Sequence, residues 1–184
     1  MHTKIENLVE NLRLITAETE TTADILEKVR PLIVELAKKP DWVLPEYRKC
    51  NEEQGFGVHL LHEEEDHSLA VLMAAWLPGF GIPPHNHGTW SVIAGIEGTE
   101  RNTMWEIAEK DESRGYAKIR ESGRVDIGPG DVLASDESAI HSVSNDGEET
   151  TLSLHVYGKN INHTVRHGFN PVEDTFARLT VKIE

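Results

Sequence analysis

The chain has 184 residues, of which 38% are hydrophobic and 27% are charged. This composition is typical of a soluble globular protein and argues against a disordered chain. Lys and Arg number 18 against 32 Asp and Glu, which gives a net charge of −14. Because nucleic acids and anionic membranes bind basic surfaces, this acidity argues against both as partners.

Three further features bear on the location of the protein. The longest apolar run, residues 69–77, is far shorter than the roughly 20 residues of a membrane helix. The first ten residues lack the apolar segment of a signal peptide. The single cysteine, Cys50, cannot form an intramolecular disulfide. We therefore expect a cytoplasmic protein.

Two helices are the first predicted elements. Apolar residues recur at helical spacing over residues 5–15 and again over residues 25–36. The threonines between these segments are candidate N-caps for the second helix: Thr19, Thr21 and Thr22. Pro31 predicts a kink or a restart inside that helix, and Pro40 and Pro45 mark the end of the helical region.

Short strands separated by turns are predicted from about residue 57 onward. Residues 68–76 are apolar on both faces and therefore predict a buried strand, while alternation over residues 179–183 predicts a last one. The other predicted strands are residues 89–94, 99–107, 117–120, 132–134, 140–144 and 150–157.

Many short strands at this spacing favour a β-sandwich or barrel. We therefore expect a mainly β chain that forms one domain over residues 1–184. Its N-terminal helices would occupy residues 1–45, and its barrel would occupy residues 55–184.

A pair of histidines, His85 and His87, forms the first candidate site. Residues i and i+2 of a strand point to the same face, so the two imidazoles could hold one metal ion. Pro83 and Pro84 restrict the backbone just before them. Two unrelated surface histidines are the alternative, because this spacing also arises by chance in a chain with ten histidines.

A longer pattern surrounds this pair: Gly79, His85, His87 and Gly98, then Gly123, Pro129-Gly130-Asp131, His141 and Asn145. It resembles the two motifs of the cupin family, whose fold is a double-stranded β-helix barrel. Ser91 stands where those motifs carry a Glu ligand. The resemblance therefore implies a three-histidine metal site made of His85, His87 and His141. Several metals accept imidazole ligands, so the ligand set does not identify the metal.

A second constellation lies on a predicted strand, where Ser153, His155 and Tyr157 alternate with Leu154 and Val156. The three polar side chains therefore share one face. Inside a barrel they would have to bond one another, because an unpaired buried polar group costs roughly 1–3 kcal/mol. An amphipathic strand with its polar face in water is the alternative.

Together, residues 84–90 (Pro-His-Asn-His-Gly-Thr-Trp) and 153–161 (Ser-Leu-His-Val-Tyr-Gly-Lys-Asn-Ile) resemble the thiol dioxygenase family. This family includes cysteine dioxygenase and bacterial enzymes that act on 3-mercaptopropionate. The resemblance covers about residues 41–171. It implies Fe(II) on the three histidines, with Ni or Zn as alternatives in the purified protein. It also implies catalytic roles for Tyr157, His155 and Ser153.

The carboxylate of such a substrate requires a cation. Animal members of the family carry an Arg on an early strand, where this chain has His59, and the bacterial relatives carry an Arg nine residues after the Tyr. That position is Arg166 here. Because a guanidinium can grip a carboxylate with two bonds, we expect Arg166 to anchor the substrate, with His59 as a further contact. A surface Arg166 paired with acids is the alternative, and Arg101 is a weaker candidate.

The family resemblance implies an iron-dependent dioxygenase that oxidises cysteine or 3-mercaptopropionate to its sulfinate with O2. A non-catalytic cupin that binds a metal or a small ligand is one alternative, and a three-histidine cupin dioxygenase acting on a carbon substrate is another. The expected partners are the thiol carboxylate and O2. The sequence leaves the physiological thiol and the oligomeric state open.

Overall fold

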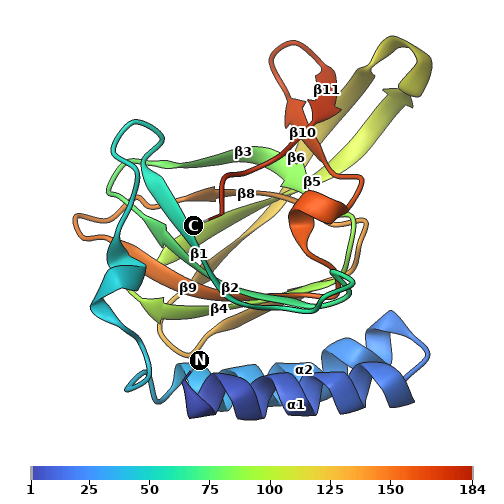
Figure 1. Cartoon of the computed structure of the whole chain (residues 1–184). Helices are drawn as coiled ribbons and strands as arrows, with labels where there is room; N and C mark the ends of the chain where they lie inside the picture. Colours follow the sequence, from blue (N-terminus) through green and yellow to red (C-terminus); the bar gives the residue numbers. More distant parts are fainter. Residues whose placement is uncertain (1, 184) are drawn as a thin grey trace.

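Two helices begin the part of the chain that this computed structural model describes, residues 2–183 (Figure 1). They are α1 (Thr3–Glu18) and α2 (Thr22–Ala37). The Thr21 side chain accepts a hydrogen bond from the backbone N–H of Asp24 at 3.2 Å, so Thr21 is the N-cap among the three candidate threonines. Within residues 2–183, no helix combines the length and the apolar character that crossing a bilayer requires.

The predicted restart at Pro31 is wrong, because α2 runs through this residue without interruption. A proline inside a helix removes the N–H that would bond the carbonyl four residues earlier, which belongs to Glu27. Both Glu27 and Pro31 are exposed, so water can satisfy that carbonyl.

The strands that follow within residues 2–183 are β1 (Phe56–Glu63), β2 (Ala70–Trp76), β3 (Gly81–Asn86), β4 (Ser91–Glu97), β5 (Glu100–Asp111), β6 (Tyr116–Ile127), β7 (Val132–Ser135), β8 (Ile140–Ser144), β9 (Thr151–Tyr157), β10 (His167–Asn170) and β11 (Thr175–Arg178). The short 3-10 helices within residues 2–183 are η1 (Pro45–Arg48), η2 (Glu112–Arg114) and η3 (Ile161–His163).

The strand predicted over residues 179–183 is wrong, because strand pairing ends at Arg178. The side chain of Asn162 takes the place of a neighbouring strand there. Its Nδ2 donates to the Val181 carbonyl at 2.8 Å, and its Oδ1 accepts from the Val181 N–H at 3.1 Å. The main chain at Val181 is thus satisfied without a sheet.

Two antiparallel sheets form the body of the molecule. One has the strand order β1-β2-β9-β4-β7, and the other closes in the order β10-β11-β6-β5-β8-β3. The helices α1 and α2 lie together outside the five-stranded sheet, below β2, β9 and β4 in Figure 1. The predicted fold class is confirmed in these features: the chain is mainly β, with two N-terminal helices and a closed barrel.

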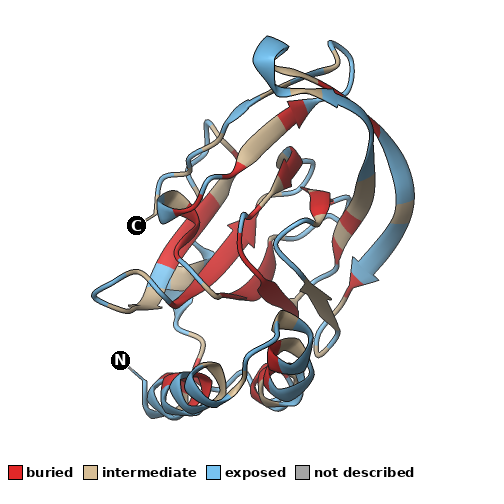
Figure 2. Cartoon of the chain, turned by 90° about the vertical axis from the view of Figure 1, so that its right-hand side faces the viewer, coloured by how far each residue is buried: buried red, intermediate tan, exposed pale blue. Residues whose placement is uncertain are grey.

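The five-stranded sheet is buried on both of its faces at its centre (Figure 2). On β9, Leu154 and Val156 belong to the hydrophobic cluster that includes residues of both helices. Because side chains alternate along a strand, Ser153, His155 and Tyr157 point the other way, into the barrel, and each is at most 5% exposed. The alternative of a polar face in water is therefore wrong.

The packing of the helices on the sheet predicts a large difference between two leucines of α1. Leu12 is fully buried, whereas Leu14 is 60% exposed. We expect Leu12→Ala to lower the free energy of unfolding by about 2–5 kcal/mol, and Leu14→Ala to change it by less than about 0.5 kcal/mol. Urea unfolding of both variants checks this. Equal losses in the two variants would show that α1 does not pack on the sheet through Leu12.

Candidate metal centre

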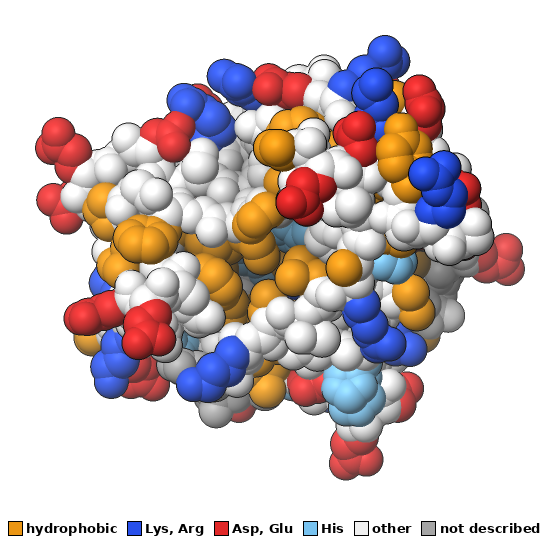
Figure 3. Space-filling model, turned by 90° about the horizontal axis from the view of Figure 1, so that it is seen from above, with side chains coloured by type: hydrophobic (Ala, Val, Ile, Leu, Met, Phe, Trp, Pro, Cys, Tyr) orange, Lys and Arg blue, Asp and Glu red, His pale blue; other side chains and the backbone are white. Residues whose placement is uncertain are grey.

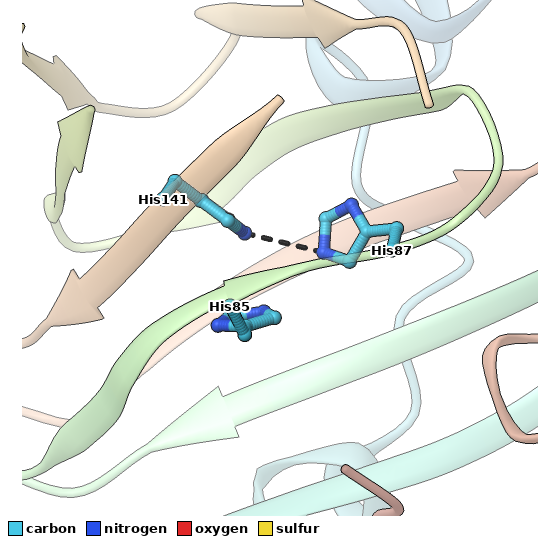
Figure 4. A group of neighbouring side chains, drawn as sticks. All are labelled: His85, His87 and His141. Carbon is cyan, nitrogen blue, oxygen red and sulfur yellow. Dashed lines mark hydrogen bonds between the residues drawn. The ribbon is translucent and has the colours of Figure 1, made fainter. Parts of the chain in front are cut away.

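Three buried histidines meet inside the barrel. His85 lies on β3, His87 follows the end of that strand, and His141 lies on β8 directly opposite His85 in the antiparallel ladder. One ring nitrogen from each residue lies within 4.8 Å of those of the other two. Figure 4 shows the ring nitrogens of His87 and His141 pointing toward one another.

Each of the three rings makes a hydrogen bond through Nδ1, which leaves Nε2 free to face the shared point. The Nδ1 partners are the Pro83 carbonyl at 2.9 Å from His85, Ser91 Oγ at 3.2 Å from His87, and Asn102 Oδ1 at 2.7 Å from His141. Such partners fix the ring orientation and the tautomer of a metal-binding histidine. Ser91, which stands where the cupin motif has a Glu, therefore orients a ligand and does not supply one.

The separations and charges of the three rings fit a metal ion. The Nε2 atoms of His87 and His141 are 3.2 Å apart. Two imidazole nitrogens that each lie about 2.1 Å from one zinc-like ion would be about 3.0–3.4 Å apart. Burial, followed by the neighbouring charges, lowers the pKa of all three histidines, that of His141 to about 4. All three are therefore neutral at neutral pH, as metal ligands must be.

A second group of candidate ligands, Glu63, His67 and His163, has a less suitable geometry. Its ligand atoms also lie within 4.8 Å of one another, but the His67 and His163 rings stack 3.4 Å apart with an interplanar angle of 12°. The lone pairs of parallel rings lie in parallel planes and do not converge on one ion. The buried trio is tilted instead, with interplanar angles of 67°, 46° and 76°. The buried trio is therefore the group whose geometry suits a metal ion.

The polar residues of β9 form the hydrogen-bonded chain that the sequence predicts. Ser153 Oγ lies 2.8 Å from His155 Nε2, and His155 Nδ1 lies 2.8 Å from the Tyr157 hydroxyl. The Tyr157 ring meets the His87 ring edge to face, with 4.9 Å between ring centroids. Burial lowers the pKa of His155 to about 3 and raises that of Tyr157, so both are neutral at neutral pH.

Arg166 reaches the same interior from the segment before β10. Gly168 of β10 pairs with His85 of β3, so this antiparallel register carries Arg166 alongside His87. Arg166 is 1% exposed, and its Nε and Nη2 have no hydrogen-bond partner among residues 2–183. An unpaired buried charge is costly, so the site calls for an anionic ligand. A surface position for Arg166, the alternative reading of the sequence, is wrong.

Gly88 permits this close approach of the two segments. It follows His87 directly and has a φ of +66°, in the left-handed region that favours glycine. A Cβ at this position would lie 2.8 Å from the Val165 carbonyl oxygen. The Thr164 hydroxyl donates to the His87 carbonyl at 2.6 Å and fixes the same contact.

The three histidines line one small cavity of about 40 Å³ together with Tyr157 and Arg166. Apolar side chains complete its wall, among them Val58, Leu72, Ile161 and Val181. In the space-filling view, hydrophobic side chains surround a hollow, and histidine lies between them (Figure 3). Typical pockets for drug-sized ligands have about 300–1,000 Å³, so this one suits a much smaller molecule.

His59 does not reach this cavity, so its prediction as a substrate contact is wrong. Its neighbour on β1, Val58, lines the cavity, and alternation along the strand points His59 to the opposite side. There, His59 Nε2 lies 2.9 Å from the Lys49 carbonyl. Arg101, the weaker candidate, is also elsewhere, since it forms ion pairs with Asp126 and Asp146.

Two polar residues of β5, Glu100 and Asn102, contact residues of the site but are not predicted by the sequence analysis. Asn102 is fully buried and bonds His141, and Glu100 is 2% exposed and bonds both Asn102 and Ser153. Their spacing of two residues on a predicted strand is a signal that could have revealed a shared inward face. It is a weak signal, because polar residues also alternate on strands that face water.

Comparison with known proteins shows similarity at a low level. No family model matches the chain. Among solved structures, oxalate oxidase in complex with glycolate aligns at 14% identity over 64% of this chain, with a TM-score of 0.45. A cupin-like protein of unknown function from Ralstonia eutropha aligns at 19% identity over 67% of this chain and 64% of its own, with a TM-score of 0.45. An RmlC-like cupin from Desulfovibrio desulfuricans aligns at 18% identity over 62% and 92%, with a TM-score of 0.44.

The alignment spans 59% of the oxalate oxidase chain. At these identities and TM-scores, function has to be argued from the site itself.

The convergence of the three histidines predicts that metal binding depends on His141. We expect His141→Gln to weaken binding of Fe(II) or Zn²⁺ by more than about 100-fold, because it removes one of three ligands. Calorimetric titration of chelator-treated protein, together with metal analysis, measures this. The control is His163→Gln, which should keep the affinity of the wild type. If His163→Gln lost the metal and His141→Gln retained it, the metal would instead bind at the stacked His67 and His163.

Burial of His155 predicts a loss of stability in acid for the metal-free protein. The unfolded residue takes up a proton near pH 6.5, whereas the folded residue has a pKa of about 3. Below pH 6.5 the unfolded state therefore binds more protons, and the free energy of unfolding falls as the pH drops, a loss that continues toward pH 3. His155 alone contributes up to about 1.4 kcal/mol per pH unit.

The matched variant is His155→Gln. Urea unfolding from about pH 7 to 5 should show a loss in this variant that is about 2 kcal/mol smaller than in the wild type. Exposed His163→Gln should behave like the wild type. Identical pH dependence in all three proteins would contradict a neutral, buried His155.

Proposed function

We propose that this chain is a metal-dependent thiol dioxygenase, which oxidises a small thiol carboxylate such as cysteine or 3-mercaptopropionate to its sulfinate with O2. One observation carries the proposal. Arg166, a buried residue with two unpaired guanidinium nitrogens, lines the same small cavity as three convergent histidines and Tyr157. A molecule with a carboxylate at one end and a thiol at the other matches both ends of this cavity.

The metal ligands in this proposal are His85, His87 and His141. Fe(II), the metal that the family resemblance implies, would supply ligation of the thiolate and activation of O2 when bound there. Three neutral imidazoles contribute no negative charge, so the site favours an anionic ligand such as a thiolate.

Arg166 binds and orients the substrate carboxylate. Its free Nε and Nη2 belong to one edge of the guanidinium, which can form two parallel bonds with a carboxylate. Two bonds also fix the direction of the ligand, so the thiol end is held toward the imidazoles. Holding the reacting groups in one geometry lowers the entropic barrier of the reaction.

Tyr157 holds a hydroxyl beside the reacting sulfur and oxygen atoms. Its position is fixed by the bond to His155, and burial keeps the phenol protonated. A hydrogen bond from this hydroxyl would stabilise negative charge that develops on oxygen. The apolar wall around it, which includes Leu72 and Ile161, excludes water and strengthens such polar interactions.

Oxygen uptake by Fe(II)-loaded protein, together with detection of sulfinate, tests the proposed activity. We expect turnover with cysteine or 3-mercaptopropionate. For these substrates, Arg166→Met should lower kcat/KM by at least about 10-fold, because hydrogen bonds to charged groups contribute about 1.5–3 kcal/mol. Cysteamine, which lacks the carboxylate, should be equally poor with both proteins.

The matched control is exposed Arg120→Met, which should retain the activity of the wild type. Metal binding without oxygen consumption on any of the three thiols would contradict the proposal. That outcome would favour a non-catalytic metal-binding module or an enzyme that acts on a carbon substrate.

A further inference from the structure

The two polar arms of the site meet at one buried carboxylate, that of Glu100. Ser153 Oγ donates to Glu100 Oε2 at 2.7 Å, and Asn102 Nδ2 donates to Glu100 Oε1 at 3.0 Å. The first arm continues through His155 to Tyr157, and the second ends at the metal ligand His141. Glu100 lies at the start of β5 and is 2% exposed, so these bonds form away from water.

Both Glu100 oxygens accept hydrogen bonds, one from Ser153 and one from Asn102, as those of an ionised carboxylate must, and this sets a direction along the first arm. The Ser153 hydroxyl donates its proton to Glu100, so Ser153 Oγ must accept a hydrogen bond from His155 Nε2–H. The other ring nitrogen of His155, Nδ1, is then unprotonated and accepts from the Tyr157 hydroxyl. Each bond in the arm is thereby oriented from Tyr157 toward Glu100.

The same reasoning orients the second arm. The amide of Asn102 must turn its NH2 group to Glu100, so its carbonyl oxygen faces His141. A carbonyl accepts, and therefore His141 carries its proton on Nδ1. The Nε2 atom of His141 is left with a lone pair toward the other two imidazoles.

We propose that Glu100 is the positioning residue of this site, whose two acceptor oxygens fix His155 as the Nε2–H tautomer and His141 as the Nδ1–H tautomer. One side chain thus prepares both the tyrosine and a metal ligand. Neither the cavity nor the group of metal ligands includes Glu100, so it acts through its neighbours.

The consequence for catalysis rests on the proposed function. Tyr157 lines the cavity, and its hydroxyl oxygen, whose proton is donated to His155, can receive the proton of a bound thiol. As the S–H bond breaks, Tyr157, His155 and Ser153 each accept one proton and pass one on, and an O–H bond forms on Glu100. Every bond in the arm is then reversed, which leaves Tyr157 as a donor toward the cavity. Burial raises the pKa of Glu100, so this carboxylate takes up a proton more readily than one in water, and the starting direction of the arm requires a pH at which it is ionised.

The test is the tautomeric state of the two histidines, read by NMR of the Zn²⁺-loaded protein labelled with 15N-histidine. At mildly alkaline pH we expect Nε2–H for His155 and Nδ1–H for His141 in the wild type. This readout requires no turnover, so its result is independent of whether the chain oxidises thiols. A wild-type His155 that carries its proton on Nδ1 would overturn the proposal.

Glu100→Gln makes the test sharper, because a glutamine offers one acceptor and one donor where the glutamate offers two acceptors. One arm must then reverse. Either His155 moves its proton to Nδ1, or His141 loses its Nδ1 proton and binds Zn²⁺ more weakly. Glu106→Gln on the same strand, where the side chain pairs with Arg120 at the surface, should leave both tautomers unchanged. Unchanged tautomers in Glu100→Gln would also overturn the proposal.

Ser153→Ala provides a second variant in case Glu100→Gln does not fold. It disconnects only the first arm, so we expect His141 to keep its Nδ1 proton while His155 loses its single Nε2–H form and populates both tautomers. A His155 that remains entirely Nε2–H without the Ser153 hydroxyl would show that Glu100 does not set its tautomer.

Discussion

Burial of the five-stranded sheet on both faces is the constraint on which the rest of this structure depends. The helices α1 and α2 remove one face from water, and the second sheet removes the other. Polar groups on the inner face, such as Ser153 and His155, therefore have no solvent to bond. Because an unpaired polar group in such surroundings is costly, these groups bond one another in a connected network. The chemistry of the site follows from that requirement.

Arg166 departs from this pattern, and the departure is informative. Among the residues that line the cavity, the buried side-chain nitrogens without a partner within residues 2–183 are the Trp76 Nε1 and two nitrogens of this guanidinium, and only the guanidinium is charged. The charge is held beside His87 by the pairing of β10 with β3 and by the Thr164 hydroxyl. A scaffold that keeps a cation desolvated and unpaired is prepared for an anion, and the small volume of the cavity limits the size of that anion.

Much of the site could be predicted from local sequence. The spacing of His85 and His87, and the alternation of Ser153, His155 and Tyr157, state which side chains share a face of a strand. The structure shows both sets turned inward. The family resemblance predicted Arg166 as a substrate contact, and in the structure Arg166 lines the cavity. The same resemblance predicted His59 as a further contact. That prediction is wrong, because the alternation along β1 that points Val58 into the cavity points His59 away from it.

Glu100 and Asn102 show where such reasoning ends. Their alternation is visible in the sequence, but Ser153 lies 53 residues from Glu100, and His141 lies 39 residues from Asn102. The sequence by itself determined which side chains share a face of a strand, the candidate caps of the second helix and the residues able to ligate a metal, because these depend on periodicity and on side-chain chemistry. Only the tertiary structure decided which faces meet, that Arg166 is unpaired, and that one carboxylate joins both arms. Those outcomes depend on the register between distant strands, which no local pattern encodes.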